Sequence, residues 1–332
     1  MSKIAVFGGG SWGTAFSTIL ADAGNDVTIW TRRQELADQI SAGRNTDYLP
    51  DHELPASISG TTDPLEAVDG ADIVVLSVPS QSLRDNLAGW GDVLGDRVVV
   101  SLMKGVELGT TKRMSEVIAE AGGVPTERIA VVSGPNLAKE IVQRQPAATV
   151  VACPDESAAD RVAAATATSY FRPYTSPDLV GAEVGGAVKN VIALAVGMAE
   201  GMGLGDNTKS SIITRGLAEM TRLGVALGAD ARTFAGLAGV GDLIATCMSP
   251  LSRNHSFGVG LGQGMTVAEV QEKTRQTAEG VKSCASIFEL ARKHDVDVPI
   301  IEQVNLVVHE GKDVLEMGNS LMARERGREV RT

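Results

Sequence analysis

The chain has 332 residues, which is enough for about two domains at the usual ~150 residues each. It carries 30 Lys and Arg against 41 Asp and Glu, a net charge of −11. No Lys/Arg-rich run interrupts this acidic background, which argues against nucleic acid as a partner. Hydrophobic residues make up 43% and charged residues 21%, an ordinary balance for a globular protein with a full core.

Cellular location and metal content can be predicted from three features. The N-terminal apolar run has only four residues, too few for the core of a signal peptide. The most apolar long stretch, 184–199, contains Lys189 and is shorter than the ~20 residues of a membrane span. Cys153, Cys247 and Cys284 are odd in number and have no CxxC spacing, which favours neither a disulfide framework nor a zinc site. We expect a cytoplasmic protein with reduced thiols, no metal and no membrane span.

Up to about residue 175, short apolar runs of strand length alternate with helical patterns. The runs lie at 4–7, 26–30, 72–78, 97–101, 129–133 and 148–152. Continuous apolar runs, in which polar residues do not alternate with apolar ones, are typical of strands that are buried on both faces of a parallel sheet when helices separate them. The predicted fold class is therefore α/β, with a Rossmann-like, doubly wound, mostly parallel sheet.

From about Leu179 the strand patterns end and only helical patterns follow. They lie at 182–200, 208–227, 281–293 and 299–309. Ser and Pro at 174–177 mark the change of period. We predict a dinucleotide-binding Rossmann domain at 1–178 and a helical substrate-binding and catalytic domain at 179–332.

The segment 8–13 reads Gly-Gly-Gly-Ser-Trp-Gly and fits the pattern G-x-G-x-x-G. It follows the first predicted strand, opens a helix at 14–21 and leads to the second strand, which is the βαβ unit of a dinucleotide-binding fingerprint. The pattern assigns Gly8 to the tight turn, Gly10 to close approach of the pyrophosphate and Gly13 to helix–strand packing. The helix N-terminus would hold the phosphate charge. A purely structural glycine-rich turn is the alternative.

The end of the second strand bears on the choice of cofactor. An NAD enzyme would have Asp or Glu about 20 residues after the glycines, to bond the ribose 2′-hydroxyl. This chain reads Trp30-Thr-Arg-Arg, without an acid. Arg32 and Arg33 offer guanidinium groups for a 2′-phosphate, although a solvated helix start would look the same. We expect NADP(H) to be preferred and NAD(H) also to be used.

Ligands of open α/β sheets lie beyond the carboxyl ends of the strands. The fourth predicted strand leads to Lys104 and Gly105, which would place a cation at this edge; a solvated surface lysine is the alternative. The fifth leads to Ser133-Gly-Pro-Asn, where we expect a helix to begin with free N–H groups.

Polar residues also interrupt the helical region. Lys189 lies in an otherwise apolar helix, and burial would lower its pKa from ~10.4 unless the side chain extends to the helix edge. Gly185 and Gly186, one turn earlier, remove side chains where another group must approach. Asp242 follows a Gly-rich turn, and Ser252-Arg-Asn is typical of a helix start that could hold a phosphate or act only as a cap.

Seven motifs occur in one order along the chain. They are Gly8-Gly-Gly-Ser-Trp-Gly-Thr-Ala, Lys104-Gly, Ser133-Gly-Pro, Gly185-Gly-Ala-Val-Lys-Asn-Val-Ile-Ala, Ile213-Thr-Arg-Gly-Leu-Ala-Glu-Met, Gly239-Val-Gly-Asp-Leu and Ser252-Arg-Asn. Together they closely resemble the bacterial NAD(P)-dependent sn-glycerol-3-phosphate dehydrogenases. The resemblance covers residues 4–321, and the Lys189 and Ile213 motifs are the most specific.

The resemblance implies roles for individual residues. Cofactor contacts would come from Ser11, Trp12, Arg32, Arg33, Lys104, Ala138, Arg253, Thr277 and Glu279. Substrate contacts would come from Lys104, Gly134, Asn136, Asp242, Ser252, Arg253 and Asn254. Lys189 would meet the substrate as the proton-transferring residue. The family often has Ser or Thr at position 136, where this chain has Asn, which can still donate a hydrogen bond.

The activity implied is hydride transfer between NAD(P)H and dihydroxyacetone phosphate, which gives sn-glycerol 3-phosphate for phospholipid synthesis. No histidine lies in a motif, so Lys189 is also the best candidate for acid–base chemistry, with Lys104 lowering its pKa further. Two alternatives stay open: another two-domain dehydrogenase that acts on a small hydroxy acid, and a non-catalytic NADP-binding sensor. The expected partner is a small molecule, and the sequence leaves a homodimer open.

Overall fold

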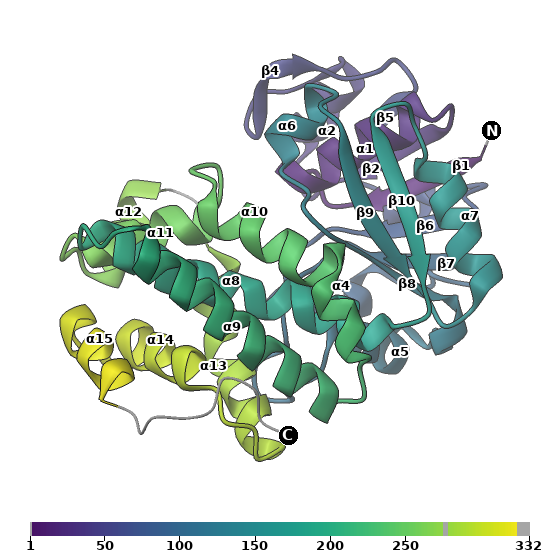
Figure 1. Ribbon diagram of the computed structural model, residues 1–332. Helices are drawn as coiled ribbons and strands as arrows, with labels where there is room; N and C mark the ends of the chain where they lie inside the picture. The colour runs from purple at the N-terminus through teal and green to yellow at the C-terminus, as the bar shows by residue number, and fades with distance from the viewer. Residues whose placement is uncertain (1, 275–277, 324–332) are drawn as a thin grey trace.

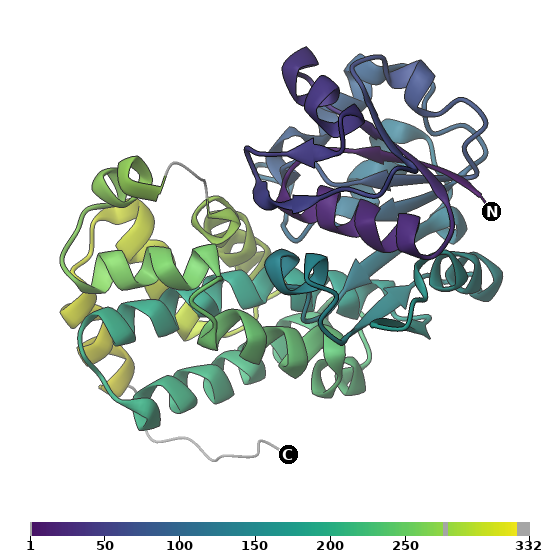
Figure 2. The same cartoon turned by 90° about the horizontal axis from the view of Figure 1, so that it is seen from above.

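The computed structural model describes residues 2–274 and 278–323. Figure 1 shows two parts side by side: a sheet with its helices, and a separate group of helices that contains the C-terminal segments. Figure 2 shows the same division from above, with the first helix of the chain lying along the sheet.

The sheet of the first part has eight strands. In chain order they are β1 (Lys3–Phe7), β2 (Asp26–Trp30), β5 (Ile58–Thr61), β6 (Ile73–Leu76), β7 (Val98–Ser101), β8 (Ile129–Ser133), β9 (Ala147–Ala152) and β10 (Phe171–Ser176). They lie in the order β10-β9-β8-β7-β6-β1-β2-β5. All neighbours are parallel except β8 and β9, so the predicted mostly parallel sheet is confirmed.

Helices cover both faces of this sheet. They are α1 (Ser11–Asp22), α2 (Gln34–Ser41), α3 (Pro64–Ala67), α4 (Leu83–Trp90), α5 (Met114–Gly122), α6 (Ala138–Val142) and α7 (Glu156–Thr166), with short 3₁₀ turns η1 (Ser80–Ser82) and η2 (Thr126–Arg128). Side chains of α1, α2 and α7 pack in one apolar cluster, and those of α3, α4 and α5 pack in another. This is the doubly wound arrangement that the sequence predicts.

Four strands were not predicted, and all are polar or lie at an edge. β5 and β10 are the two edge strands of the sheet, where a strand needs fewer apolar residues; β10 even contains Pro173. The short strands β3 (Arg44–Asn45) and β4 (Leu49–Glu53) form a separate antiparallel hairpin, residues 44–53. The antiparallel pairing of β9 was not predicted either, because an apolar run does not reveal strand direction.

After β10 the described chain is helical. The elements are α8 (Leu179–Gly201), α9 (Asp206–Ala226), the 3₁₀ turn η3 (Ala231–Ala235), the π-helical turn η4 (Leu237–Gly241), α10 (Asp242–Met248), α11 (Arg253–Gly262), α12 (Val267–Thr274), α13 (Glu279–Lys293), α14 (Pro299–Glu310) and α15 (Val314–Met322). The start of α8 coincides with the predicted domain boundary at 178/179, although the division into two folding units stays a prediction.

The long helix α8 is the core of the helical part. By length and composition it could cross a membrane, but 94% of its most apolar 18-residue window is buried inside the protein. Apolar side chains of α9, α11, α13 and α14 pack against it in one cluster. Its apolar character is therefore explained by burial within the fold. The three cysteines are also buried and form no disulfide.

Four glycines let α8 and α11 cross in backbone contact. Gly197 and Gly201 of α8 meet Gly258 and Gly262 of α11. A Cβ on Gly258 would lie 2.2 Å from the carbonyl oxygen of Leu194, so any side chain there would push the helices apart. The crossing also fixes the start of α11 beside the middle of α8.

Gly258→Ala should lower the free energy of unfolding by about 1–3 kcal/mol, because the new methyl group has no space. Gly318→Ala is the matched control: this glycine also lies in a helix, and a Cβ there would meet nothing within 4 Å. The control should be neutral or stabilising by up to about 1 kcal/mol. Urea denaturation of both variants measures the difference, and equal effects would contradict the close crossing.

Candidate active site

The glycine turn after β1 has the geometry of a phosphate-binding loop. Gly8 has a φ of +125°, and a Cβ on Gly13 would lie 2.0 Å from the carbonyl oxygen of Gly8. Beside Gly10, in contrast, nothing lies within 4 Å of the position of a Cβ. Gly10 caps α1 without a side chain, so the first N–H groups of this helix lack a side-chain acceptor. These features fit a dinucleotide whose pyrophosphate approaches Gly10 and the helix N-terminus.

The two residues after Gly10 lie at the same helix start. The Ser11 hydroxyl donates to the carbonyl oxygen of Tyr48 at 3.5 Å. The Trp12 ring packs edge-on against Phe16, and its Nε1 is buried without a hydrogen-bond acceptor among the residues described. Their contacts with a cofactor stay predictions.

The two arginines after β2 differ in their surroundings. Arg32 is exposed and makes no ion pair with the residues that the structure describes. Arg33 forms an ion pair with Asp47 of the hairpin 44–53. Of the two guanidinium groups, only that of Arg32 is therefore without a carboxylate partner in the described structure. The sequence did not reveal this difference between the two arginines.

Two lysines from the two parts of the molecule share one carboxylate. Lys104, just after β7, donates from Nζ to Oδ2 of Asp242 at 2.6 Å and to the carbonyl oxygen of Gly134 at 3.1 Å. Lys189 of α8 donates to Oδ1 of Asp242 at 2.5 Å and to the Thr246 hydroxyl at 2.7 Å. Asp242 is the first residue of α10 and is 1% exposed. Both lysines are thus paired. Lys104 is not a solvated surface lysine, and the Lys189 side chain does not extend past the edge of its helix, so both alternatives are wrong.

Burial lowers the pKa of Lys189 to about 8, against an ordinary value of 10.5. The negative charge of Asp242 opposes this shift, and the positive charge of Lys104 adds to it. This is the direction that the sequence predicts. A lysine with such a pKa can both release and accept a proton near neutral pH.

The glycines that precede Lys189 make room for other parts of the protein. A Cβ on Gly186 would lie 3.0 Å from the Ser133 hydroxyl and 3.2 Å from Cγ of Lys104. A Cβ on Gly185 would lie 2.3 Å from the carbonyl oxygen of Ala238. The strand ends and the turn before Asp242 can therefore reach α8, which brings the cluster of Lys104, Lys189 and Asp242 together.

The segment after β8 differs from the prediction. The expected helix start at Gly134–Asn136 is wrong: α6 begins at Ala138, because Leu137 still has an extended backbone (φ −81°, ψ 110°). Gly134 has a φ of +155°, and the Asn136 amide donates to the Thr149 hydroxyl at 3.0 Å. Oδ1 of Asn136 is buried and accepts no hydrogen bond within the described structure, so it is available to a ligand that donates one.

The motif at 252–254 is a helix start, as predicted. The Ser252 hydroxyl accepts from the N–H of His255 at 3.3 Å and caps α11. Arg253 is exposed and has no hydrogen-bond or ion-pair partner in the part of the chain described. Asn254 donates to Oδ1 of Asn190 at 2.9 Å, and Asn190 donates to the carbonyl oxygen of Lys104 at 3.2 Å.

Sequence reasoning missed two residues of this cluster. Asn190 links Asn254 to Lys104, and Thr246 accepts from Lys189. Asn190 follows Lys189 directly, and Thr246 lies four residues after Asp242, one helical turn away. The short distances in sequence from Asn190 to Lys189 and from Thr246 to Asp242 could have identified both residues as part of the site.

Of the two predicted cofactor contacts furthest along the chain, Glu279 is the first residue of α13. It accepts from the Ser80 hydroxyl at 2.8 Å, which brings it next to the strand end after β6. Thr277 lies outside the described residues. Within residues 2–274 and 278–323, no group of three or more His, Cys, Asp or Glu side chains could hold a metal ion.

A Rossmann sheet whose strand ends face a buried lysine on a helical second part defines a nucleotide-dependent dehydrogenase. The family models for the NAD-dependent glycerol-3-phosphate dehydrogenase N-terminus and C-terminus match residues 3–159 and 178–319. This chain belongs to the NAD-dependent glycerol-3-phosphate dehydrogenase family, as its motifs predict.

Individual relatives cover nearly the whole chain. A glycerol-3-phosphate dehydrogenase [NAD(P)+] of Streptomyces griseus is 65% identical over 97% of this chain and 96% of its own length. One from Thermobifida fusca is 58% identical over 98% of this chain and 97% of its own. The crystal structure of glycerol-3-phosphate dehydrogenase from Coxiella burnetii has a TM-score of 0.92 and 33% identity, and the match covers 97% of this chain and 99% of that one.

If Lys189 is the proton-transferring group, the rate of ketone reduction should fall as the pH rises through about 8, since its ammonium form is then lost. The rate of alcohol oxidation should rise over the same range, since the neutral amine would be the base. Profiles of kcat/KM against pH in both directions measure this. Two profiles that rise together would contradict the assignment of the titrating group to Lys189.

Proposed function

We propose that the chain transfers hydride reversibly between NAD(P)H and dihydroxyacetone phosphate and forms sn-glycerol 3-phosphate. The observation that carries the proposal is the cluster at the strand ends, in which the buried Asp242 pairs with the buried Lys189 and the partly buried Lys104. The relatives named above are glycerol-3-phosphate dehydrogenases, which supports the same substrate here. The product would serve phospholipid synthesis.

The substrate phosphate would lie at the start of α11. Arg253 offers an exposed guanidinium without a partner among the described residues, and Ser252 and Asn254 lie on either side of it. Lys104, Gly134 and Asn136 would contact the substrate from the strand ends. Because phosphate is a strong acceptor, a guanidinium and a helix N-terminus suit it well.

Proton transfer would be the task of Lys189. A bound nicotinamide cofactor supplies or accepts the hydride at C2 of the substrate. In the reductive direction Lys189 would give its proton from Nζ to the oxygen on C2, and in the oxidative direction it would take the proton back. Asp242 and Thr246 hold Nζ in place, and Lys104 adds positive charge beside the developing oxyanion.

The cofactor would lie along the glycine turn. Gly8, Gly10 and Gly13 shape the turn, and the proposed contacts are Ser11, Trp12, Arg32, Arg33, Lys104, Ala138, Arg253, Thr277 and Glu279. NADP(H) and NAD(H) would both be used. We place the enzyme in the cytoplasm, since its buried cysteines are all free; a homodimer stays a prediction.

The direct test is the loss of NADPH absorbance when dihydroxyacetone phosphate is added to the purified protein. Pyruvate or glyoxylate in its place tests the hydroxy-acid alternative. Turnover only with dihydroxyacetone phosphate supports the proposal. Turnover only with a 2-oxo acid, or nucleotide binding without turnover on any of these substrates, would contradict it.

Arg253→Ala should raise KM for dihydroxyacetone phosphate by about 10- to 100-fold, since a charge-assisted hydrogen bond is worth about 1.5–3 kcal/mol. Arg161→Ala is the control, because Arg161 is an exposed arginine on α7 that the site does not use. Steady-state kinetics of both variants measure the effect. An unchanged KM in Arg253→Ala would show that this arginine only begins a helix.

A further inference from the structure

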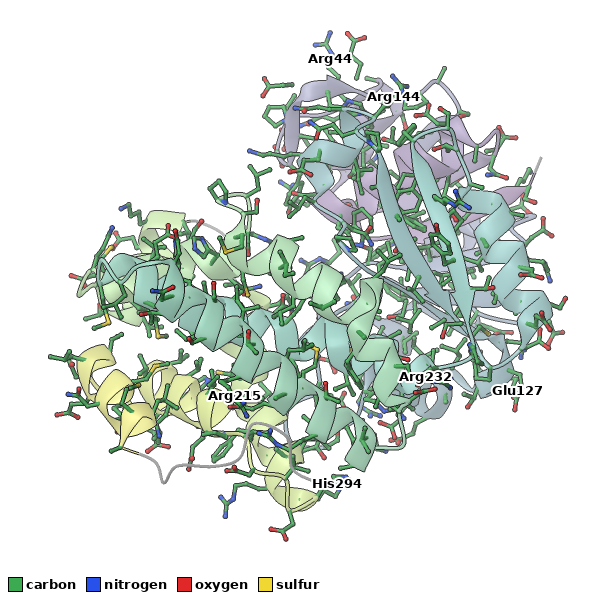
Figure 3. The ribbon with its side chains drawn as sticks, viewed as in Figure 1. Arg44, Glu127, Arg144, Arg215, Arg232 and His294 are labelled. Carbon is green, nitrogen blue, oxygen red and sulfur yellow. The ribbon has the colours of Figure 1, made fainter. Side chains whose placement is uncertain are left out.

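The hairpin 44–53 is fixed against the glycine turn. Asn45 is fully buried, and its amide donates to the carbonyl oxygen of Gly9 at 2.9 Å and to the Thr14 hydroxyl at 2.8 Å. The Ser11 hydroxyl adds its contact with Tyr48. In Figure 1 the hairpin, labelled at β4, lies at the edge of the sheet domain; Figure 3 labels Arg44, its first residue, whose side chain extends outward there. The turn of the hairpin therefore has a set position relative to the proposed pyrophosphate site.

Asp47 lies in this turn, between Asn45 and Tyr48, and pairs with Arg33. Arg33 directly precedes α2 and follows the end of β2, where the ribose 2′ position of a bound dinucleotide lies in this fold. The side chains of Arg33 and Asp47 are 52% and 37% exposed. Because the pair is open to water, it can break when a stronger anion arrives. Arg32, next to it, has no such carboxylate.

We propose that Asp47 is a specificity-determining residue, which weakens the preference for NADP(H) over NAD(H) by competing with the 2′-phosphate for Arg33. The inference rests on the proposed cofactor site. A 2′-phosphate that binds Arg33 must displace or share the Asp47 carboxylate, and the two anions repel each other.

The same carboxylate acts differently on NAD(H). A 2′-hydroxyl has no charge, so Asp47 does not repel it and can accept a hydrogen bond from it. In NAD enzymes an acid at the end of the second strand has that task. Here the strand end carries Arg32 and Arg33, and the acid comes from a hairpin that follows in the chain. The proposed site thus holds arginines that suit the 2′-phosphate of NADP(H) and a carboxylate that suits the 2′-hydroxyl of NAD(H).

Asp47→Asn should raise the ratio of kcat/KM for NADPH to that for NADH by about 3- to 10-fold, mainly through a lower KM for NADPH. The gain should shrink in high salt, because the charges are exposed. Asp51→Asn is the matched control: it removes the same charge from the same hairpin, and Asp51 is an exposed residue without an ion pair in the described structure. An unchanged ratio in Asp47→Asn, or an equal gain in both variants, would overturn the proposal.

A second comparison separates competition for Arg33 from a general effect of charge. In an Arg33→Ala background, Asp47→Asn should raise the cofactor ratio clearly less than in the wild-type background, since the contested partner is gone and only the direct effect of the Asp47 carboxylate on the ribose 2′ group remains. A gain as large as in the wild-type background would overturn the proposal.

Binding measurements separate this inference from the proposed activity. Calorimetry with 2′-phospho-ADP-ribose and ADP-ribose needs no substrate. If Asp47→Asn tightens only the 2′-phosphorylated compound, the inference is supported, even in a protein that fails to reduce dihydroxyacetone phosphate. If it tightens both or neither, the inference is overturned, even where the reductase activity is present.

Discussion

The sharing of Asp242 between Lys104 and Lys189 is the interaction on which the site depends. A buried ammonium is costly unless it is paired, and here one carboxylate, itself 1% exposed, is bonded to the buried Lys189 and the partly buried Lys104. The cluster therefore has one positive charge more than negative when both lysines are protonated. That excess suits a substrate that is an anion and becomes more negative at its oxygen during reduction. Burial, with a smaller contribution from the positive charge of Lys104, lowers the pKa of Lys189 to about 8, whereas Asp242 opposes the shift.

The same interaction joins the two parts of the molecule, because Lys104 follows a strand of the sheet and Lys189 lies in α8. Glu183, further back on α8, adds a second link: it accepts from the Ser115 hydroxyl at 2.6 Å and from Arg113 at 2.6 Å, both near the start of α5. Glycines at 185, 186, 197 and 201 allow strand ends and α11 to come close to α8. These glycines of α8 thus help to bring the parts of the site together.

Much of this could be predicted from the sequence, for physical reasons that differ between residues. Strands buried on both faces, such as β6 and β7, require continuous apolar runs, and the glycine turn requires glycine at Gly8 and Gly13. Lys189 was evident because a charge in an apolar helix is rare. Edge strands, by contrast, tolerate polar residues, so β5 and β10 had no clear pattern.

Pairings between residues that are distant in the sequence could not be predicted. The partner of Arg33 is 14 residues away in a polar hairpin, and the partner of Lys189 is 53 residues away. No local spacing predicts either pair, because both depend on how the elements pack. Their effects on charge and pKa could therefore be derived only from the structure.

The proposed chemistry depends on proton transfer by Lys189, and removal of its amine tests that role. For Lys189→Ala we predict that kcat with dihydroxyacetone phosphate falls by about 10²–10⁴, the usual contribution of a general acid–base group. NADPH affinity, measured by fluorescence titration, should stay within a few fold, because the proposed cofactor contacts lie elsewhere. A variant that keeps more than about a hundredth of the wild-type kcat would show that Lys189 is not the proton-transferring group.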